Sequence, residues 1–314
     1  MNGDDDDTLT LAPTPNGEAF WGRALHSDSD VTEFNINGGT LALRPPQGGA
    51  LMLGAAFGSY QSIVFNIRGA FSVRQTNVAG NSQSGFPRAT FNIYAGGKCS
   101  ISEGGYFTGS LAVNVNDLGS MIVSAHAIKI EDGTYVATGI ADADSPSLEL
   151  IAWRSLADPY SGNFDIARHR ITCKSSSVCR LQATSMSYTA SHIRAEETAS
   201  LLIACDAIDL DSSTVFAVGQ GSAAITFAGS EKNEAPFDII NNAYPKGLFN
   251  FIATEGANTS TFRFLNIGSA FEFNKLQAEG VITINGAPDT QYKCDWRSEA
   301  DGSDKYFVIF LKSA

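Results

Sequence analysis

The sequence predicts an all-β protein whose short strands stack coil upon coil into a parallel β-helix, or β-solenoid, with an antiparallel β cap at the C-terminal end. The first observation is an internal repeat, because residues 120–139 (SMIVSAHAIKIEDGTYVATG) return without a gap as residues 200–219 (SLLIACDAIDLDSSTVFAVG). The second is an apolar–polar–apolar triplet that recurs along the chain. The third is a composition of 30 glycines and 20 phenylalanines with only 17% charged residues. Repeated strand-like units joined by turn residues are typical of solenoids.

The repeat also predicts which side chains are inside. Successive side chains of a strand point to opposite faces, so alternate apolar residues share the interior. The residues expected there are Val123, Ile128 and Ile130 in the first copy and Ile203, Ile208 and Leu210 in the second. The ungapped alignment also gives Thr134 and Thr214 the same position.

The triplet begins with phenylalanine and ends with isoleucine. It occurs at residues 34–36, 65–67, 91–93, 164–166 and 237–239, with asparagine or aspartate in the middle. We expect the two apolar residues to stack above their counterparts inside the solenoid, while the polar residue faces outward.

Three parts of the chain differ in composition and sequence pattern. Residues 1–33, which include four aspartates at 4–7, are interpreted as an N-terminal arm or docking segment. Residues 34–230 form the predicted solenoid, and residues 231–314 the β-rich cap. Closely spaced phenylalanine pairs at 249/251, 262/264 and 271/273 predict an antiparallel meander in the cap.

Charge and composition exclude several classes of partner. A formal net charge of −12 repels phosphate backbones, so we expect no nucleic acid partner. No apolar run is long enough to span a bilayer, so we expect no membrane insertion. The N-terminus lacks the basic end and apolar stretch of a cleavable signal peptide. A virion, or the outside of a cell, is the expected location.

The cysteines and histidines favour no metal site and no cofactor. No Cys/His spacing is typical of zinc. Threading residues 162–179 onto 119–136 puts Cys173 and Cys179 at apolar positions, so we expect buried thiols, with a disulfide between them as the alternative. The same alignment superposes His169 on His126 and predicts both on the surface.

The repeat, the asparagine and glycine turns and the short apolar alternation resemble the right-handed parallel β-helix superfamily. That superfamily includes pectate-lyase-like enzymes, phage tailspikes and adhesins. The resemblance covers residues 34–230 and is one of architecture alone. It implies a fold and transfers no active-site residues, because unrelated functions share this fold.

Candidate site residues follow from carbohydrate chemistry. Glycosidases use a pair of carboxylates, for which Glu149, Asp165, Asp206 and Asp209 are weak candidates, together with Asp158 and Asp211. Trp153 and Tyr160 flank a segment unlike the repeats and are candidate stacking platforms for sugar rings. The simpler interpretation of these carboxylates is an outward-facing, solubilising role.

The leading hypothesis is a structural or recognition protein of a phage, phage-like particle or bacterial surface, such as a tail spike or adhesin, that binds a cell-surface polysaccharide or receptor. A polysaccharide lyase or glycosidase acting in a groove is the first alternative. A self-assembling filament or coat subunit is the second. We expect a homo-oligomer, with a trimer favoured because attachment gains from multivalency.

Overall fold

The computed structural model describes residues 2–3, 8–11, 18–21, 31–43, 50–53, 55–56, 59–60, 62–74, 83–102, 106–138, 146–153, 162–229, 244–253, 258–265, 270–287 and 293–312. In these residues the protein is almost entirely β-structure. Most strands belong to two long sheets, which we call sheet A and sheet B.

Sheet A has 16 strands. Its main row runs in the order β1 (Asn2–Gly3), β4 (Val31–Ile36), β9 (Ser62–Ile67), β11 (Gln83–Ile93), β13 (Tyr106–Val115), β15 (Ala127–Ala137), β18 (His169–Cys173), β21 (His192–Glu197), β24 (Val215–Gly221), β26 (Phe249–Phe251) and β28 (Ile282–Ile284). A side row continues from the N-terminal halves of β11, β13 and β15. It contains β3 (Glu18–Trp21), β6 (Ala50–Leu53), β17 (Asn163–Ala167), β20 (Ser185–Thr189) and β23 (Ala207–Leu210).

Sheet B has 12 strands. Their order is β2 (Thr8–Leu11), β5 (Thr40–Leu43), β10 (Ala70–Arg74), β12 (Lys98–Ser102), β14 (Ser120–Ala125), β16 (Leu148–Ala152), β19 (Val178–Gln182), β22 (Ser200–Ala204), β25 (Ala224–Ala228), β27 (Thr261–Leu265), β30 (Asp304–Lys312) and β29 (Lys293–Asp301). A small hairpin of β7 (Ala55–Ala56) and β8 (Ser59–Tyr60) and the helix α1 (Ala270–Ala278) complete the described elements.

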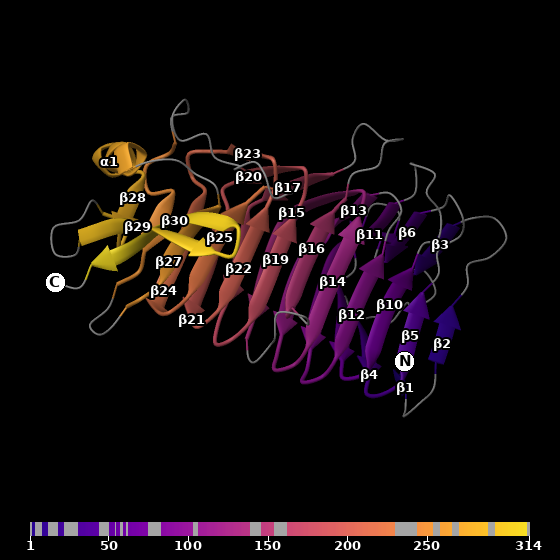
Figure 1. Cartoon of the computed structure of the whole chain (residues 1–314). Helices are drawn as coiled ribbons and strands as arrows, with labels where there is room; N and C mark the ends of the chain where they lie inside the picture. The colour runs from indigo at the N-terminus through magenta and orange to yellow at the C-terminus, as the bar shows by residue number, and fades with distance from the viewer. Residues whose placement is uncertain are drawn as a thin grey trace.

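Parallel pairing dominates both sheets. Among the described strands, the antiparallel pairs are β7–β8, β27–β30 and β29–β30. The strands lie side by side in an elongated stack, with β1 to β3 near one end and α1, β28 and β29 near the other (Figure 1). Because the chain passes repeatedly between sheets A and B, each passage adds strands to both. This arrangement is compatible with a solenoid.

We call a set of residues in register across successive strands a column, and one step along it a rung. Four asparagines form one such column on the outer face of sheet A, and the first three are the middle residues of predicted triplets. Asn66 donates to Asn35, Asn92 to Asn66 and Asn114 to Asn92, at 2.9, 3.0 and 2.9 Å and at separations of 31, 26 and 22 residues. Unequal separations mean that some passages carry longer connecting segments.

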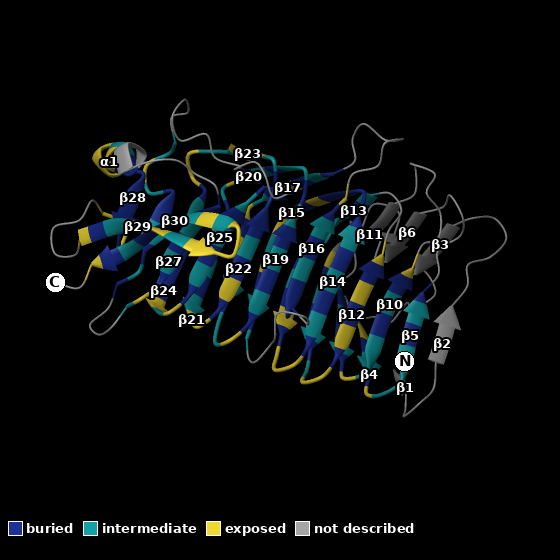
Figure 2. Ribbon diagram, viewed as in Figure 1, coloured by how far each residue is buried: buried dark blue, intermediate teal, exposed yellow. Residues whose placement is uncertain are grey.

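Buried and partly exposed residues alternate along the strands, as the sequence predicts (Figure 2). Phe34, Phe65 and Phe91 are buried and stack in one column, with ring centroids 5.1 and 4.8 Å apart. The triplet prediction is therefore confirmed for its first three copies. Phe164 is also buried, but it lies in the side row in register with Ile128, so the fourth copy occupies another column. The copy at 237–239 lies outside the described residues.

Register also tests the long repeat. Ile128, Phe164, Met186 and Ile208 follow one another in one column, which places the two copies three rungs apart. Beyond Ile208 the ungapped alignment is wrong by one residue. It pairs Tyr135 with residue 215, whereas the column of Tyr135 leads to Phe216.

The extra residue of the second copy lies in a turn held by Asp211. The Asp211 carboxylate accepts hydrogen bonds from the Ser213 backbone N–H and the Thr214 hydroxyl, at 3.1 and 2.7 Å. Thr214 is consequently buried, whereas Thr134 is exposed, so these two threonines do not share a position.

The predicted interior is largely confirmed. Val123, Ile128, Ile130 and Ile203 are at most 1% exposed. Ile208 and Leu210 are only partly buried, which corrects the prediction for this pair. They lie on β23, which pairs only with β20 among the described strands, so no further rung covers them.

The C-terminal part differs from the predicted meander. Phe249 pairs in parallel with Phe216, and Phe262 pairs in parallel with Ile225, so these phenylalanines continue the stack. Phe273 lies in helix α1, where it is buried. Antiparallel pairing at this end is found at β27, β30 and β29, which form the edge of sheet B. The division at residues 33 and 230 stays a prediction, although β1, β2 and β3 of the arm pair in parallel with β4, β5 and β6.

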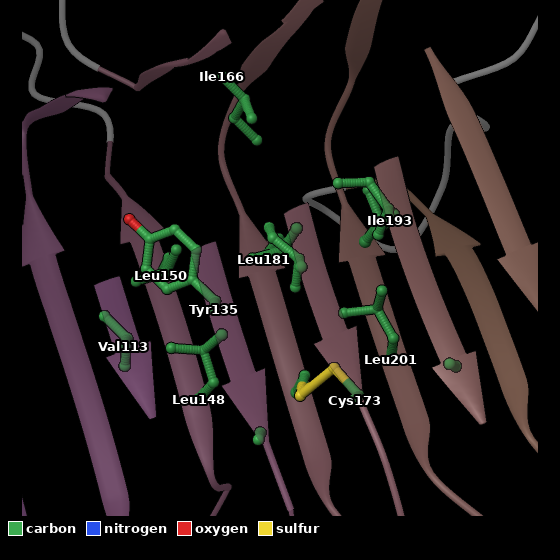
Figure 3. Packing of buried hydrophobic residues seen from close by; sticks show 14 of the residues in the cluster. Val113, Tyr135, Leu148, Leu150, Ile166, Cys173, Leu181, Ile193 and Leu201 are labelled. Carbon is green, nitrogen blue, oxygen red and sulfur yellow. A yellow bond between two sulfur atoms is a disulfide. The ribbon is translucent and has the colours of Figure 1, made fainter. Parts of the chain in front are cut away.

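Cys173 and Cys179 form a disulfide inside the core, so the expectation of two thiols is wrong and the alternative is correct (Figure 3). Cys173 ends β18 in sheet A and Cys179 lies on β19 in sheet B, so the bond joins the sheets across one turn. Both side chains are at most 1% exposed. The threaded alignment failed here because Cys173 is in register with Ala137 rather than Ile130.

Candidate functional site: an arginine-lined groove

The predicted carboxylates do not converge on one site. Glu149 lies on sheet B, where its carboxylate pairs with Arg180 at 2.9 Å and its side chain is 12% exposed. Asp206 is half-buried in the turn between β22 and β23. Asp158 lies outside the described residues.

Asp165 and Asp209 do share a column. Both are exposed on the outer face of the side row, with Ser187 between them in register. Two rungs separate their backbones by about 9.5 Å at the usual strand spacing. Lys129 precedes Asp165 in the same column.

Trp153 follows β16 and is 36% exposed. Its ring lies edge-on against His126, with centroids 3.8 Å apart. His126 is buried at the corner between β14 and β15, and His169 is buried inside sheet A, so the prediction that both are surface residues is wrong. Tyr160, the other predicted platform, lies outside the described residues.

A groove of about 370 Å³ lies on the outer face of sheet A, where the side row meets the main row. We call it the arginine groove. Arg88, Arg168 and Arg170 border it together with Asp132, and its floor includes Ser110 and Ala112. None of these residues was a predicted site residue.

Backbone irregularities create the groove. The β11–β13 and β13–β15 pairs both shift register where the side row meets the main row. In β11 the two residues within the shift are Pro87 and Arg88. Such bulges redirect side chains. Arg168 has a positive φ of 56°, an unfavourable conformation for a residue with a Cβ. Strained residues of this kind cluster at functional sites.

Side-chain size explains the depth. Thr90, Ala112, Thr134 and Arg170 follow one another in register across β11, β13, β15 and β18. Short side chains therefore separate the Arg88 end of the groove from Arg170. The long guanidinium side chains form its borders.

Arg168 is held by Asp132 from the preceding rung. Its Nε and Nη2 groups donate to the two carboxylate oxygens at 2.7 and 3.0 Å, in the two-pronged geometry typical of strong arginine–carboxylate pairs. These hydrogen bonds hold the pKa of the Asp132 carboxyl below its usual range. Asp132 therefore stays ionised and fixes Arg168.

Arg88 and Arg170 are not held in this way. Both are exposed, and neither forms an ion pair or side-chain hydrogen bond with another described residue. Within the described part of the chain, two guanidinium groups at the borders of the groove therefore lack an acidic partner.

The floor of the groove rests on a buried histidine. His169 Nε2 lies 3.0 Å from the Ile130 carbonyl oxygen, and burial lowers the pKa of His169 to about 4. A Cβ at Gly133 would lie 2.6 Å from Tyr135 Cε2 and 2.9 Å from His169 Cε1, so a larger residue at this position would displace these two rings. A neutral imidazole therefore supports the strand below the arginines.

Sequence reasoning missed this site because its residues are far apart in the chain. Asp132 and Arg168 are separated by 36 residues, and only the register brings them together. Pro87 was the one local signal, since proline inside a strand often marks a bulge.

Comparisons with known protein families, curated proteins and solved structures returned no match. Within the described residues, no helix has the length and apolar character needed to cross a membrane. The described part of the chain also contains no cluster of three or more His, Cys, Asp or Glu residues that could hold a metal ion.

Proposed function

We propose that this protein is a right-handed β-solenoid that recognises a polysaccharide or receptor glycan, as a tail spike, adhesin or related component of a phage, phage-like particle or bacterial surface. The arginine groove carries this proposal. It is a hollow on a sheet whose opposite face is tightly packed, and rigid elements hold binding groups in place.

The surroundings of the groove support a sugar ligand. Thr90 and Thr134 supply hydroxyl groups, and the asparagine column continues beside them at Asn92 and Asn114. Alternating residues of one strand share a face, so these amides lie on the same outer surface as the threonines. Such a row of donors and acceptors matches the hydroxyl groups of an extended glycan.

The buried disulfide supports a location outside the cytoplasm. Disulfides persist in oxidising environments and are rare where thiol reductants are abundant. A virion or cell-surface protein meets that condition.

One observation favours a second function, an inverting glycosidase on the side row. Asp165 and Asp209 face outward in one column, with backbones separated by about two strand spacings. Inverting glycosidases place their two carboxyl groups about 6.5–9.5 Å apart.

A panel of neutral and acidic bacterial polysaccharides tests these functions. We expect saturable binding without a fall in polymer size. Depolymerisation that is lost in both Asp165→Asn and Asp209→Asn would establish the enzyme instead. A protein that neither binds nor cleaves any member would contradict recognition and favour the filament or coat subunit.

A further inference from the structure

We propose that the arginine groove binds an acidic saccharide, whose carboxylate or sulfate groups pair with Arg88 and Arg170. This inference rests on the proposed recognition function and specifies the chemical class of its ligand. It assigns separate roles to the three arginines of the groove.

Charge is the first step. The chain has a formal net charge of −12, yet this groove gathers three arginines against one aspartate. Asp132 engages Arg168 through two hydrogen bonds, whereas Arg88 and Arg170 have no ion pair among the described residues. Guanidinium groups match carboxylates and sulfates through paired N–H donors, so Arg88 and Arg170 are suited to bind an anionic ligand.

Spacing is the second step. Three rungs separate the strand position of Thr90, two residues beyond Arg88, from that of Arg170. At the usual strand spacing this distance is about 14 Å. This is the separation of the two backbone positions, and each arginine side chain extends from its own end of the groove. A polymer with an anionic group on successive sugar units can pair with both arginines.

The chemistry of the lining is the third step, and it favours a saccharide over a nucleic acid. None of the described residues that line the groove is aromatic, so unpaired bases would find no stacking surface. Threonine and serine hydroxyls instead face the space between the arginines.

Calorimetry with defined ligands tests the inference. The probes are an oligomannuronate, the same oligosaccharide with its carboxylates reduced to alcohols, a sulfated oligosaccharide, inorganic sulfate and single-stranded DNA. We expect binding of at least one acidic oligosaccharide, weakened by added salt. The carboxyl-reduced form and inorganic sulfate should bind far more weakly.

Arg88→Ala and Arg170→Ala should each weaken binding of the acidic oligosaccharide roughly tenfold to a hundredfold. Arg74→Ala is the matched control, because Arg74 is an exposed arginine on sheet B, and it should bind as the native protein does. Circular dichroism of all three variants verifies that the sheets are intact.

Several results would overturn the inference. One is equal binding of the reduced and acidic oligosaccharides, and another is unchanged binding by both groove variants. A third is tighter binding of DNA than of either acidic oligosaccharide. Binding of neutral glycans alone would overturn the acidic specificity and leave the recognition function intact, whereas no binding of any glycan would overturn both.

Discussion

His169 shows how one residue ties the interior of the stack to its outer face. Its ring is fully buried, stacks on Tyr135 with centroids 5.6 Å apart, and lies against Gly133 in the floor of the groove. Burial is the largest influence on its pKa. The Ile130 carbonyl and the Asp132 charge oppose the lowering, while the Arg168 charge adds to it. The imidazole is therefore neutral at physiological pH.

This state predicts a specific dependence of stability on pH. The pKa of His169 is about 4 in the folded protein and about 6.5 when unfolded, so the unfolded chain binds a proton first as the pH falls. The contribution of the neutral His169 to the free energy of unfolding is intact above about pH 6.5 and is lost progressively towards pH 4. The loss amounts to about 3 kcal/mol.

Denaturant unfolding at pH 7 and near pH 4.5 measures this effect. The free energy of unfolding should fall between pH 7 and pH 4.5 in the native protein. In His169→Gln this fall should be smaller by about 2 to 3 kcal/mol, since glutamine has no proton to gain. His192→Gln removes an exposed histidine at the start of β21, in register with Arg170, and should retain the decline in unfolding free energy seen in the native protein. An identical pH dependence in native protein and His169→Gln would contradict the buried neutral imidazole.

At the scale of single residues, the sequence predicted much of the core but not the arginine groove. Strand alternation correctly placed Ile128 and Ile203 inside, because alternation is a local property. His169 was wrongly placed on the surface, because its polar contact is the Ile130 carbonyl, 39 residues earlier in the chain, which no local pattern reveals. The arginine groove depends on register over three rungs, which no local pattern encodes.

At the scale of elements, the asparagine column links separate strands of sheet A. Asn35, Asn66, Asn92 and Asn114 form three side-chain hydrogen bonds across β4, β9, β11 and β13. Each bond joins neighbouring rungs and runs parallel to the backbone ladder. Such a row penalises a register slip, because a slip by one residue would turn these amides into the core.

Asn92→Ala tests this role. The substitution removes two of the three hydrogen bonds and should lower the free energy of unfolding by about 1 to 2 kcal/mol. Asn163→Ala is the control, since Asn163 is a partly exposed asparagine of the side row that makes no side-chain hydrogen bond with a described residue. Equal unfolding free energies for the two variants would mean that the hydrogen bonds of the asparagine column do not stabilise the fold.

Elements were predictable where one short pattern sufficed. The triplets at 34–36, 65–67 and 91–93 predicted both the phenylalanine stack and the outward asparagines. Residues 271–273 were wrongly assigned to a strand, because a single pair of apolar residues is too short a pattern to distinguish a strand from a helix. Phe273 and Leu276 are buried in α1 and lie three residues apart, which is helical spacing.

At the scale of the molecule, the parallel stack and the antiparallel end have different roles. Parallel rungs hold the outer face of sheet A in a regular array, on which the groove and the asparagine column lie. The β29–β30 hairpin pairs with β27 and ends the parallel run of sheet B. Phe249, Phe251 and Phe262 are at most 1% exposed, so these three phenylalanines are already covered within the chain.

Multivalency remains the physical reason to expect self-assembly. One groove on one chain gives one contact, whereas three chains joined together bring three grooves to the same surface. Each tethered site raises the effective concentration for the next and can strengthen attachment by about 10² to 10⁴-fold. Light scattering should therefore give a multiple of the 33.3 kDa chain mass, with a trimer favoured, and binding to an immobilised polysaccharide should exceed binding to a soluble oligosaccharide of the same composition. A mass near 33.3 kDa at every concentration, together with equal affinity for the immobilised and soluble glycan, would refute assembly, because a monomer gains nothing from a crowded surface.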